Sequence, residues 1–167
     1  LNIIHGDNAQ GKTSLLEALL YVCTARSHRT LNERELACHG EEGFSITATA
    51  QRSDREVQLE AHYWQKAKRF KINGVPQTRV SDILGRINTV FFSPEDVALV
   101  KGSGSMRRRF LDMEISQINP RYLGALQRYR QALKQRNSLL KQHRPDPALL
   151  EIWDAQLAPA GEILMNE

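Results

Sequence analysis

The segment from Gly6 to Thr13 contains the residues whose types and spacing are most clearly suited to chemistry. It reads G-D-N-A-Q-G-K-T and matches G-x-x-x-x-G-K-[ST], the pattern of phosphate-binding loops. Gly6 and Gly11 permit a backbone in which successive amide N–H groups surround phosphate oxygens. Lys12 supplies a flexible positive charge for the β- and γ-phosphates, and the Thr13 hydroxyl is suited to coordinate Mg²⁺. The segment therefore predicts a site for ATP with Mg²⁺.

The whole loop is assigned to the nucleotide, and Thr13 is also the predicted metal ligand. Asn8 and Gln10 are expected to add polar contacts. A glycine-rich turn without a ligand is the alternative interpretation, and no residue that contacts the base is identifiable. The predicted nucleotide-binding residues are Gly6, Asp7, Asn8, Ala9, Gln10, Gly11, Lys12 and Thr13.

The loop needs a strand before it and a helix after it. Leu1 to His5 is apolar enough to predict a short buried strand, and Lys12 to Cys23 is apolar on most sides, as a helix covered by a sheet would be. The N-terminus of that helix would add partial positive charge at the loop. The predicted order is strand, loop, helix.

The rest of the chain predicts an α/β protein with a helical arm. Residues 27–40 are polar and predict an irregular or partly helical connection. Residues 45–51, 56–64 and 68–72 alternate apolar and polar positions, and Asn73-Gly74 is a hairpin turn, so these segments predict an antiparallel meander. Residues 87–92 predict a buried strand. Helices are expected at 94–100, 105–118, 120–143 and from Ala148, with a kink or stop at Pro159.

This pattern divides the chain into a phosphate-loop lobe with the meander, 1–104, and a helical arm, 105–167, that begins a second domain. The start without Met and the end directly after a helical pattern suggest a fragment of a longer protein. ATP hydrolysis would require an acidic residue at the end of a strand. The nearest candidate segment, 91–96, contains a proline that argues against it, so we assign no catalytic residue.

Composition predicts a globular protein of the cytoplasm. The chain is 41% hydrophobic and 25% charged, and no run approaches the roughly 18 apolar residues of a membrane span. Cys23 and Cys38 have no metal-site spacing, and Cys23 is expected to be a buried, reduced thiol. The net charge is +4, yet residues 101–144 contain eleven Lys or Arg against two acidic residues. This asymmetry indicates a polyanionic partner.

Four arginines are the candidates for DNA contact: Arg29, Arg107, Arg108 and Arg109. Arg29 follows the phosphate-loop helix, and the other three form the densest basic cluster. A solvated helix face, or an ion pair for Arg29, is the alternative in each case. His28 is expected to be structural. Tyr122, Leu126 and Tyr129 lie on one helical stripe and are expected to pack rather than to stack on bases.

Several motifs together resemble the RecF family of bacterial DNA replication and repair proteins. They are G-D-N-A-Q-G-K-T-S-L-L-E-A-L at the loop, A-R-S-H-R-T at 25–30, F-F-S-P-E-D-V-A-L-V-K-G at 91–102, R-R-R-F-L-D-M-E at 107–114 and L-K-Q-R-N-S-L-L-K at 133–141. The resemblance implies an ABC-type ATPase head of the SMC class, with an ATP-dependent homodimer and weak ATP hydrolysis. It also implies binding to double-stranded or gapped DNA, and RecO and RecR as partners.

The chain departs from this family by omission. The strand before Leu1, the signature motif, the acidic strand and the loop after it are absent from the sequence. Dimerisation and turnover by these 167 residues alone are therefore in doubt. Two other hypotheses stay open: a fragment of another P-loop ATPase or kinase without a DNA role, and a folding unit that is inert until the missing part is present.

Overall fold

The chain forms two compact units, residues 1–92 and 93–167. The computed structural model describes residues 1–30, 32–52 and 55–167, without the side chains of Arg52, Glu95 and Ala98. Leu31, in the connection predicted at 27–40, lies outside the described residues.

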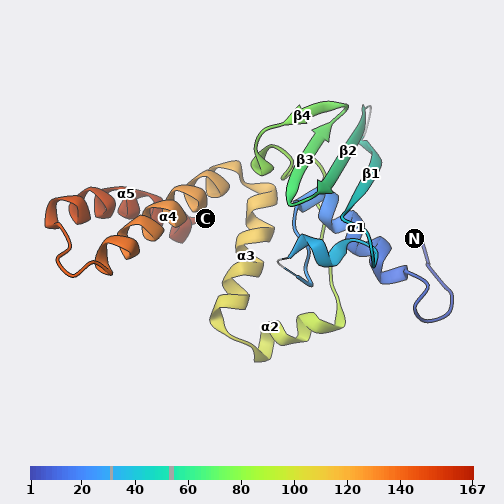
Figure 1. Cartoon of the computed structure of the whole chain (residues 1–167), viewed down its shortest axis with the longest axis horizontal. Helices are drawn as coiled ribbons and strands as arrows, with labels where there is room; N and C mark the ends of the chain where they lie inside the picture. Colours follow the sequence, from blue (N-terminus) through green and yellow to red (C-terminus); the bar gives the residue numbers. More distant parts are fainter. Residues whose placement is uncertain (31, 53–54) are drawn as a thin grey trace. The chain divides into compact units, whose positions relative to one another are not determined.

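The first unit combines one long helix with an antiparallel sheet (Figure 1). Its elements are α1 (Lys12–Thr24), η1 (Glu33–Leu36), β1 (Gly43–Arg52), β2 (Arg55–Trp64), β3 (Ala67–Ile72), β4 (Val75–Gln77) and η2 (Val80–Asp82).

The sheet is a meander in the order β1-β2-β3-β4, as the alternation of apolar residues predicts. The turn between β3 and β4 is Asn73-Gly74, with φ of 49° and 77°, which confirms the predicted hairpin. Gln65 and Lys66 form a second two-residue turn with φ of 46° and 71°. Both turns have the positive φ that matches the twist of the strands they join.

The core of the first unit lies between α1 and one face of the sheet. Tyr21 is 1% exposed and packs edge-on against Phe44, with ring centroids 5.2 Å apart. Leu59 and Phe70 complete this contact from β2 and β3. The buried side chains of α1 all lie between Glu17 and Thr24, so the second half of the helix anchors it and the first half stays exposed.

Two strands predicted in this unit are wrong. Leu1–His5 and residues 87–92 are apolar but form no strand, and Ile3, Val90 and Phe92 are largely exposed. A strand is stabilised by hydrogen bonds to a neighbouring strand. The four strands of the meander pair only with one another, and no described strand is paired with either segment.

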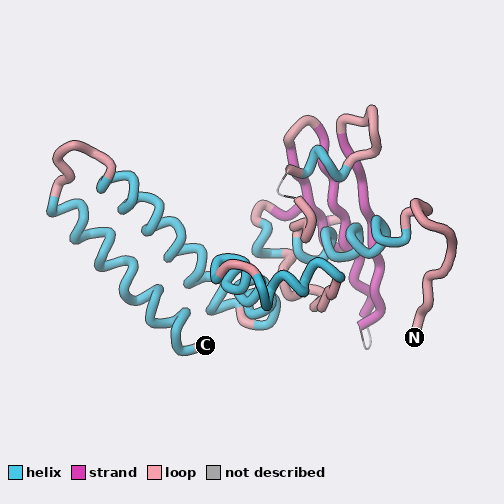
Figure 2. The backbone as a smooth tube through the Cα atoms, turned by 90° about the horizontal axis from the view of Figure 1, so that it is seen from below, coloured by secondary structure: helices cyan, strands magenta, loops and turns pink. Residues whose placement is uncertain are grey.

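The second unit is helical, as predicted. Its elements are η3 (Pro94–Val97), α2 (Ala98–Lys101), α3 (Gly104–Ile118), α4 (Pro120–Leu140) and α5 (Pro147–Asn166). Helices α4 and α5 run antiparallel to each other (Figure 2). Asn119 and Asp146 cap their N-termini, with side-chain oxygens that accept hydrogen bonds from the backbone.

Of the kink or stop expected at Pro159, the stop is wrong. Helix α5 continues to Asn166 with Pro159 inside. A proline within a helix costs about 3 kcal/mol, because it removes a hydrogen bond and crowds the preceding turn. Packing against α4 offsets this cost: Ala160 is 3% exposed, and Gly161 lies beside the Tyr129 ring, where an added Cβ would be in ordinary contact at 3.5 Å.

The boundary between the two units lies between Phe92 and Ser93. The sequence pattern placed the start of the arm later, at residue 105. The division into domains 1–104 and 105–167 stays a prediction. Among the described residues, no helix is long and apolar enough to cross a membrane.

The two cysteines differ in environment, and thiol chemistry should separate them. Cys23 is 4% exposed, and burial raises the pKa of its thiol to about 11, whereas Cys38 is exposed. At pH 8 we expect one equivalent of a disulfide reagent such as DTNB to react rapidly and the second only after denaturation. A Cys38→Ser variant should lack the rapid phase. Equal reaction rates for the two thiols in the native protein would contradict this packing.

Candidate functional site

The loop before α1 has an unusual backbone. Ala9 and Gly11 have φ of 64° and 81°, and the side chains from Gly6 to Gly11 are exposed. For an alanine this left-handed conformation costs roughly 1–2 kcal/mol. Strain of this kind concentrates at binding sites, where the surrounding structure holds the backbone in place.

The N-terminus of α1 is open to an anion. Gly11 occupies the N-cap position, where no side chain forms a capping hydrogen bond, and the first turn has no acidic residue. The first bond of the helical pattern runs from the Leu15 amide to the Gly11 carbonyl, over 2.9 Å. The amides of Lys12, Thr13 and Ser14 therefore have no partner within the helix, and the helix dipole adds positive charge beside them.

Lys12 closes the loop. Its ammonium group donates to the Gly6 carbonyl at 2.8 Å and to the Asp7 carbonyl at 2.5 Å. An ammonium group has three N–H donors, so one remains for a phosphate oxygen. Thr13 is exposed in the first turn. Loop amides, a lysine ammonium and a threonine hydroxyl thus converge at one end of the helix.

A partly buried hydrogen-bond network joins α1 to the segment after it. The Ser27 hydroxyl donates to the Glu17 carboxylate at 2.6 Å and accepts from the amides of Arg29 and Thr30. The Arg29 guanidinium donates to Glu17 at 3.4 Å and to the Glu35 carbonyl at 3.3 Å. Arg29 was a candidate for DNA contact, with an ion pair as the alternative. The structure shows an ion pair between Arg29 and Glu17.

His28 is held by packing. Its ring lies on Phe91 with centroids 4.5 Å apart, and its Nδ1 atom is buried without a hydrogen bond to any described residue. No acidic or nucleophilic partner of His28 is found in the part of the chain that the structure describes. This environment fits a structural residue.

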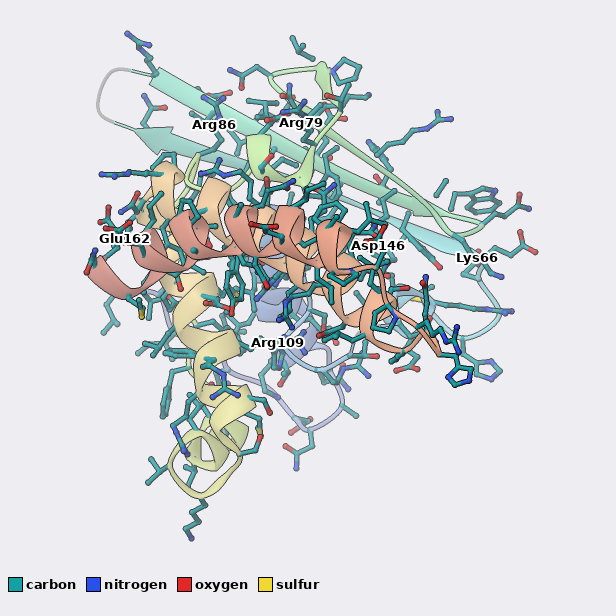
Figure 3. All side chains as sticks on the ribbon, turned by 90° about the vertical axis from the view of Figure 1, so that its left-hand side faces the viewer. Lys66, Arg79, Arg86, Arg109, Asp146 and Glu162 are labelled. Carbon is teal, nitrogen blue, oxygen red and sulfur yellow. The ribbon has the colours of Figure 1, made fainter. Side chains whose placement is uncertain are left out.

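The three clustered arginines, Arg107, Arg108 and Arg109, differ in their contacts. Arg107 donates to the carbonyls of Gly102 at 2.9 Å and Leu99 at 3.4 Å, so it caps the end of α2. Arg108 and Arg109 are exposed and form no ion pair with a described residue. Arg109 projects from α3 (Figure 3).

Several cations of the arm are structural. Asp112 accepts from the Tyr122 hydroxyl and from Arg130, both at 2.6 Å, and so links α3 to α4. Burial and this hydrogen bond raise the pKa of Tyr122 to about 12. Arg136 pairs with Asp154 at 2.5 Å across α4 and α5. The exposed cations whose side chains form neither an ion pair nor a hydrogen bond among the described residues of this unit are Lys101, Arg108, Arg109, Arg128, Lys134, Lys141 and Arg144.

No carboxylate site for hydrolysis is found in the described chain. Asp96 accepts hydrogen bonds from the Ser93 amide at 2.7 Å and the Ser93 hydroxyl at 3.0 Å, at the start of η3. The neighbouring Glu95 side chain lies outside the described structure. No group of three or more described His, Cys, Asp or Glu residues is placed to hold a metal ion.

A family model described as AAA domain matches residues 1–152. The chain belongs to this family. Its fold is that of an ABC-type ATPase head: a first lobe with an antiparallel meander, followed by a helical arm.

The predicted resemblance to RecF is confirmed by curated relatives. Proteins named DNA replication and repair protein RecF are 44% identical in Streptococcus equi subsp. zooepidemicus over 166 residues and 43% identical in Bacillus cytotoxicus over 169 residues. These alignments cover 99% and 100% of this chain and 45% of each relative. The chain therefore spans less than half the length of the curated relatives it matches.

Solved structures agree. A structure described as the recombination mediator protein RecF-ATP in the RecFOR pathway superposes with a TM-score of 0.92 at 38% identity, covering 99% of this chain and 46% of that one. A second, with RecF-ATPrS, has a TM-score of 0.87 at 38% identity and covers 96% of this chain and 45% of the other.

Sequence reasoning missed Glu17 and Ser27. Both are polar residues within an apolar context, and a glutamate on the buried side of a predicted helix signals that a partner must neutralise it. The partner, ten residues away, could not be identified without the path of the chain.

Removing the Ser27 hydroxyl tests this network. A Ser27→Ala variant removes one hydrogen bond from the buried Glu17 carboxylate, which keeps Arg29, and leaves two backbone amides without their acceptor, so we expect the free energy of unfolding to fall by about 1–3 kcal/mol. Urea unfolding followed by circular dichroism measures it. Ser14→Ala, at an exposed position of the same helix, is the matched control and should change stability little. An equal effect of the two substitutions would show that the network does not stabilise the fold.

Proposed function

We propose that this chain binds ATP with Mg²⁺ through Gly6–Thr13, as the nucleotide-binding part of a DNA replication and repair protein of the RecF kind. The observation that carries the proposal is the open N-terminus of α1, with Lys12 beside it. The similar structures with RecF-ATP and RecF-ATPrS support it.

The loop has the donors that a triphosphate requires. The amides of the first turn of α1 and of the preceding loop would bind phosphate oxygens, and the third N–H of Lys12 would reach the β- and γ-phosphates. The Thr13 hydroxyl would hold Mg²⁺ together with phosphate oxygens and water, which suits a cation that needs few protein ligands. Asp7, Asn8, Ala9 and Gln10 would line the loop. When bound, Mg²⁺ neutralises phosphate charge.

The further functions belong to the longer protein. We propose an ATP-dependent homodimer with weak ATP hydrolysis, RecO and RecR as partners, gapped or double-stranded DNA as the substrate, and a cytoplasmic location. Their support is the similarity to proteins named for DNA replication and repair and for the RecFOR pathway.

For this chain we assign the DNA contact to the arm. Arg108 and Arg109 are the best candidates because they are exposed and have no ion pair within the described chain, while Arg107 and Arg29 are engaged by protein groups. A P-loop ATPase or kinase without a DNA role is the alternative, and it predicts no affinity for DNA.

The nucleotide site is tested by Lys12→Ala. Isothermal titration with Mg-ATP should show affinity reduced roughly 10- to 100-fold, because a hydrogen bond to a charged group contributes about 1.5–3 kcal/mol. Lys66→Ala removes the same charge from an exposed turn of the same unit and should bind like the unmodified chain. Equal heats for the chain and for Lys12→Ala would refute the assignment.

The DNA contact is tested by the double substitution Arg108→Ala/Arg109→Ala. Affinity for a duplex, measured by fluorescence anisotropy, should fall, because fewer phosphates are neutralised by the arm. The slope of log K against log salt should become shallower by about 0.9 for each phosphate that the variant no longer neutralises.

The matched control for this experiment is Arg34→Ala/Arg79→Ala, which removes two exposed charges from the first unit and should leave the salt slope unchanged. Absence of duplex binding by the unmodified chain at low salt would favour the kinase-like alternative.

A further inference from the structure

The face of the meander that turns away from the core has a row of polar side chains across three strands. Alternate residues of β2 are buried against the core, so Glu60 and His62 point to the opposite face. Ser45 on β1 and Arg69 on β3 are the cross-strand partners of His62, so both share this face with it. β1 is the edge strand of the described sheet (Figure 1), and Ser45 is exposed there.

Three of these side chains are joined by hydrogen bonds. The Ser45 hydroxyl lies 2.9 Å from Nδ1 of His62, and Nε2 of the same ring lies 3.2 Å from the Glu60 carboxylate. Lys71 also donates to Glu60, at 3.3 Å. The hydrogen bond from His62, with a further contribution from Lys71, lowers the pKa of Glu60, so this carboxylate is ionised at neutral pH.

The ionised carboxylate fixes which nitrogen of His62 carries the proton. A carboxylate can only accept hydrogen bonds, so Nε2 must be the donor to Glu60. In the neutral ring Nδ1 is then the acceptor, and the Ser45 hydroxyl must donate to it. The hydroxyl is therefore bonded to a base that a carboxylate orients, which is the arrangement that activates a serine as a nucleophile.

A shallow hollow beside His62 gives a substrate access to this serine. Its volume is about 460 Å³. Trp64 is 55% exposed and supplies an apolar wall. The Arg69 side chain is exposed and forms no hydrogen bond or ion pair with a described residue, so it is available to an oxygen on which negative charge develops. The residues that line the hollow are His62, Trp64, Ala67, Arg69 and Lys71.

The charges near the hollow are mixed. Glu56 belongs to the same row of β2 but lies at the other end of the strand, roughly 20 Å from His62. With carboxylates and cations side by side, the hollow favours a substrate without net charge. The charged residues on and beside this end of the face include Glu42, Glu60, Lys66, Arg69 and Lys71.

We propose that Ser45 is the nucleophile of a site that hydrolyses uncharged esters with an aromatic group, for which Trp64 is the binding surface. His62 acts as general base and then as general acid, Glu60 orients its ring, and Arg69 stabilises the oxyanion.

The reaction has two steps. The Ser45 oxygen forms a bond to the carbonyl carbon of the ester, and its proton passes to Nδ1 of His62. The bond from that carbon to the alcohol oxygen breaks, and the alcohol leaves with the proton. Water then attacks the acyl-serine, again through His62, which releases the acid and restores the Ser45 hydroxyl.

The direct test is reaction of the unmodified chain with a fluorophosphonate, which forms an oxygen–phosphorus bond with an activated serine and releases fluoride. Mass spectrometry of the digested chain should show Ser45 as the labelled residue, with no label when the chain is unfolded in urea beforehand. A native chain without label, or equal labelling of the native and unfolded chain, would overturn the proposal.

Hydrolysis of 4-nitrophenyl acetate separates the roles of the residues. A Cys38→Ser chain is the background, because an exposed thiol also reacts with this ester. On that background, Ser45→Ala and His62→Gln should each lower kcat/KM about 100-fold, at the lower end of the usual contribution of general acid–base catalysis. Glu60→Gln should lower kcat without changing KM, and Glu60→Asp should restore part of the rate.

Thr49→Ala is the matched control, because it removes a hydroxyl from the same face of β1, opposite Gln58. It should hydrolyse the ester like the Cys38→Ser chain. Equal rates for Ser45→Ala and Thr49→Ala would overturn the proposal and leave the row as hydrogen bonds that only support the sheet. The site shares no residue with Gly6–Thr13 and does not rest on the proposed function, so either experiment can fail without the other.

Discussion

The first unit depends on how α1 packs against the sheet. The helix is buried only in its second half, where Tyr21 contacts Phe44 and Phe70. Because this contact anchors the helix at one end, its first turn is left free of side-chain contacts that would occupy the backbone amides. A helix buried along its whole length would satisfy its hydrophobic surface better but would leave less room for a ligand at its N-terminus. The phosphate site that we propose is in this sense a consequence of where the apolar contacts stop.

Electrostatics divides the basic residues into those that hold the fold together and those that are available to a partner. Arg130 and Arg136 bridge helices through Asp112 and Asp154, and Arg29 is bound to Glu17. Partly exposed pairs of this kind contribute little stability each, so their main effect is to fix how neighbouring elements meet. Arg108 and Arg109 form no such pair within the described chain. A count of charges along the sequence cannot separate these groups, because the partner is often more than ten residues away.

The sequence was sufficient for the features that depend on local periodicity and on turn chemistry. The meander followed from alternation along 45–72 and from Asn73-Gly74. The unusual backbone of the loop followed from its glycines, while its binding of a nucleotide stays a prediction. It was not sufficient where burial depends on a distant partner. Ile3 and Phe92 are apolar enough to predict buried strands, yet no strand lies beside them in the described chain. Pro159 is tolerated because α4 packs against the turn that follows it.

The central claim is that the backbone of the loop and of the first turn of α1 holds the phosphates of ATP. Hydrogen–deuterium exchange with and without saturating Mg-ATP measures this directly, amide by amide. The account predicts slower exchange at residues 9–14, with no change in α4 and α5. Unchanged exchange at residues 9–14 in the presence of Mg-ATP would contradict it.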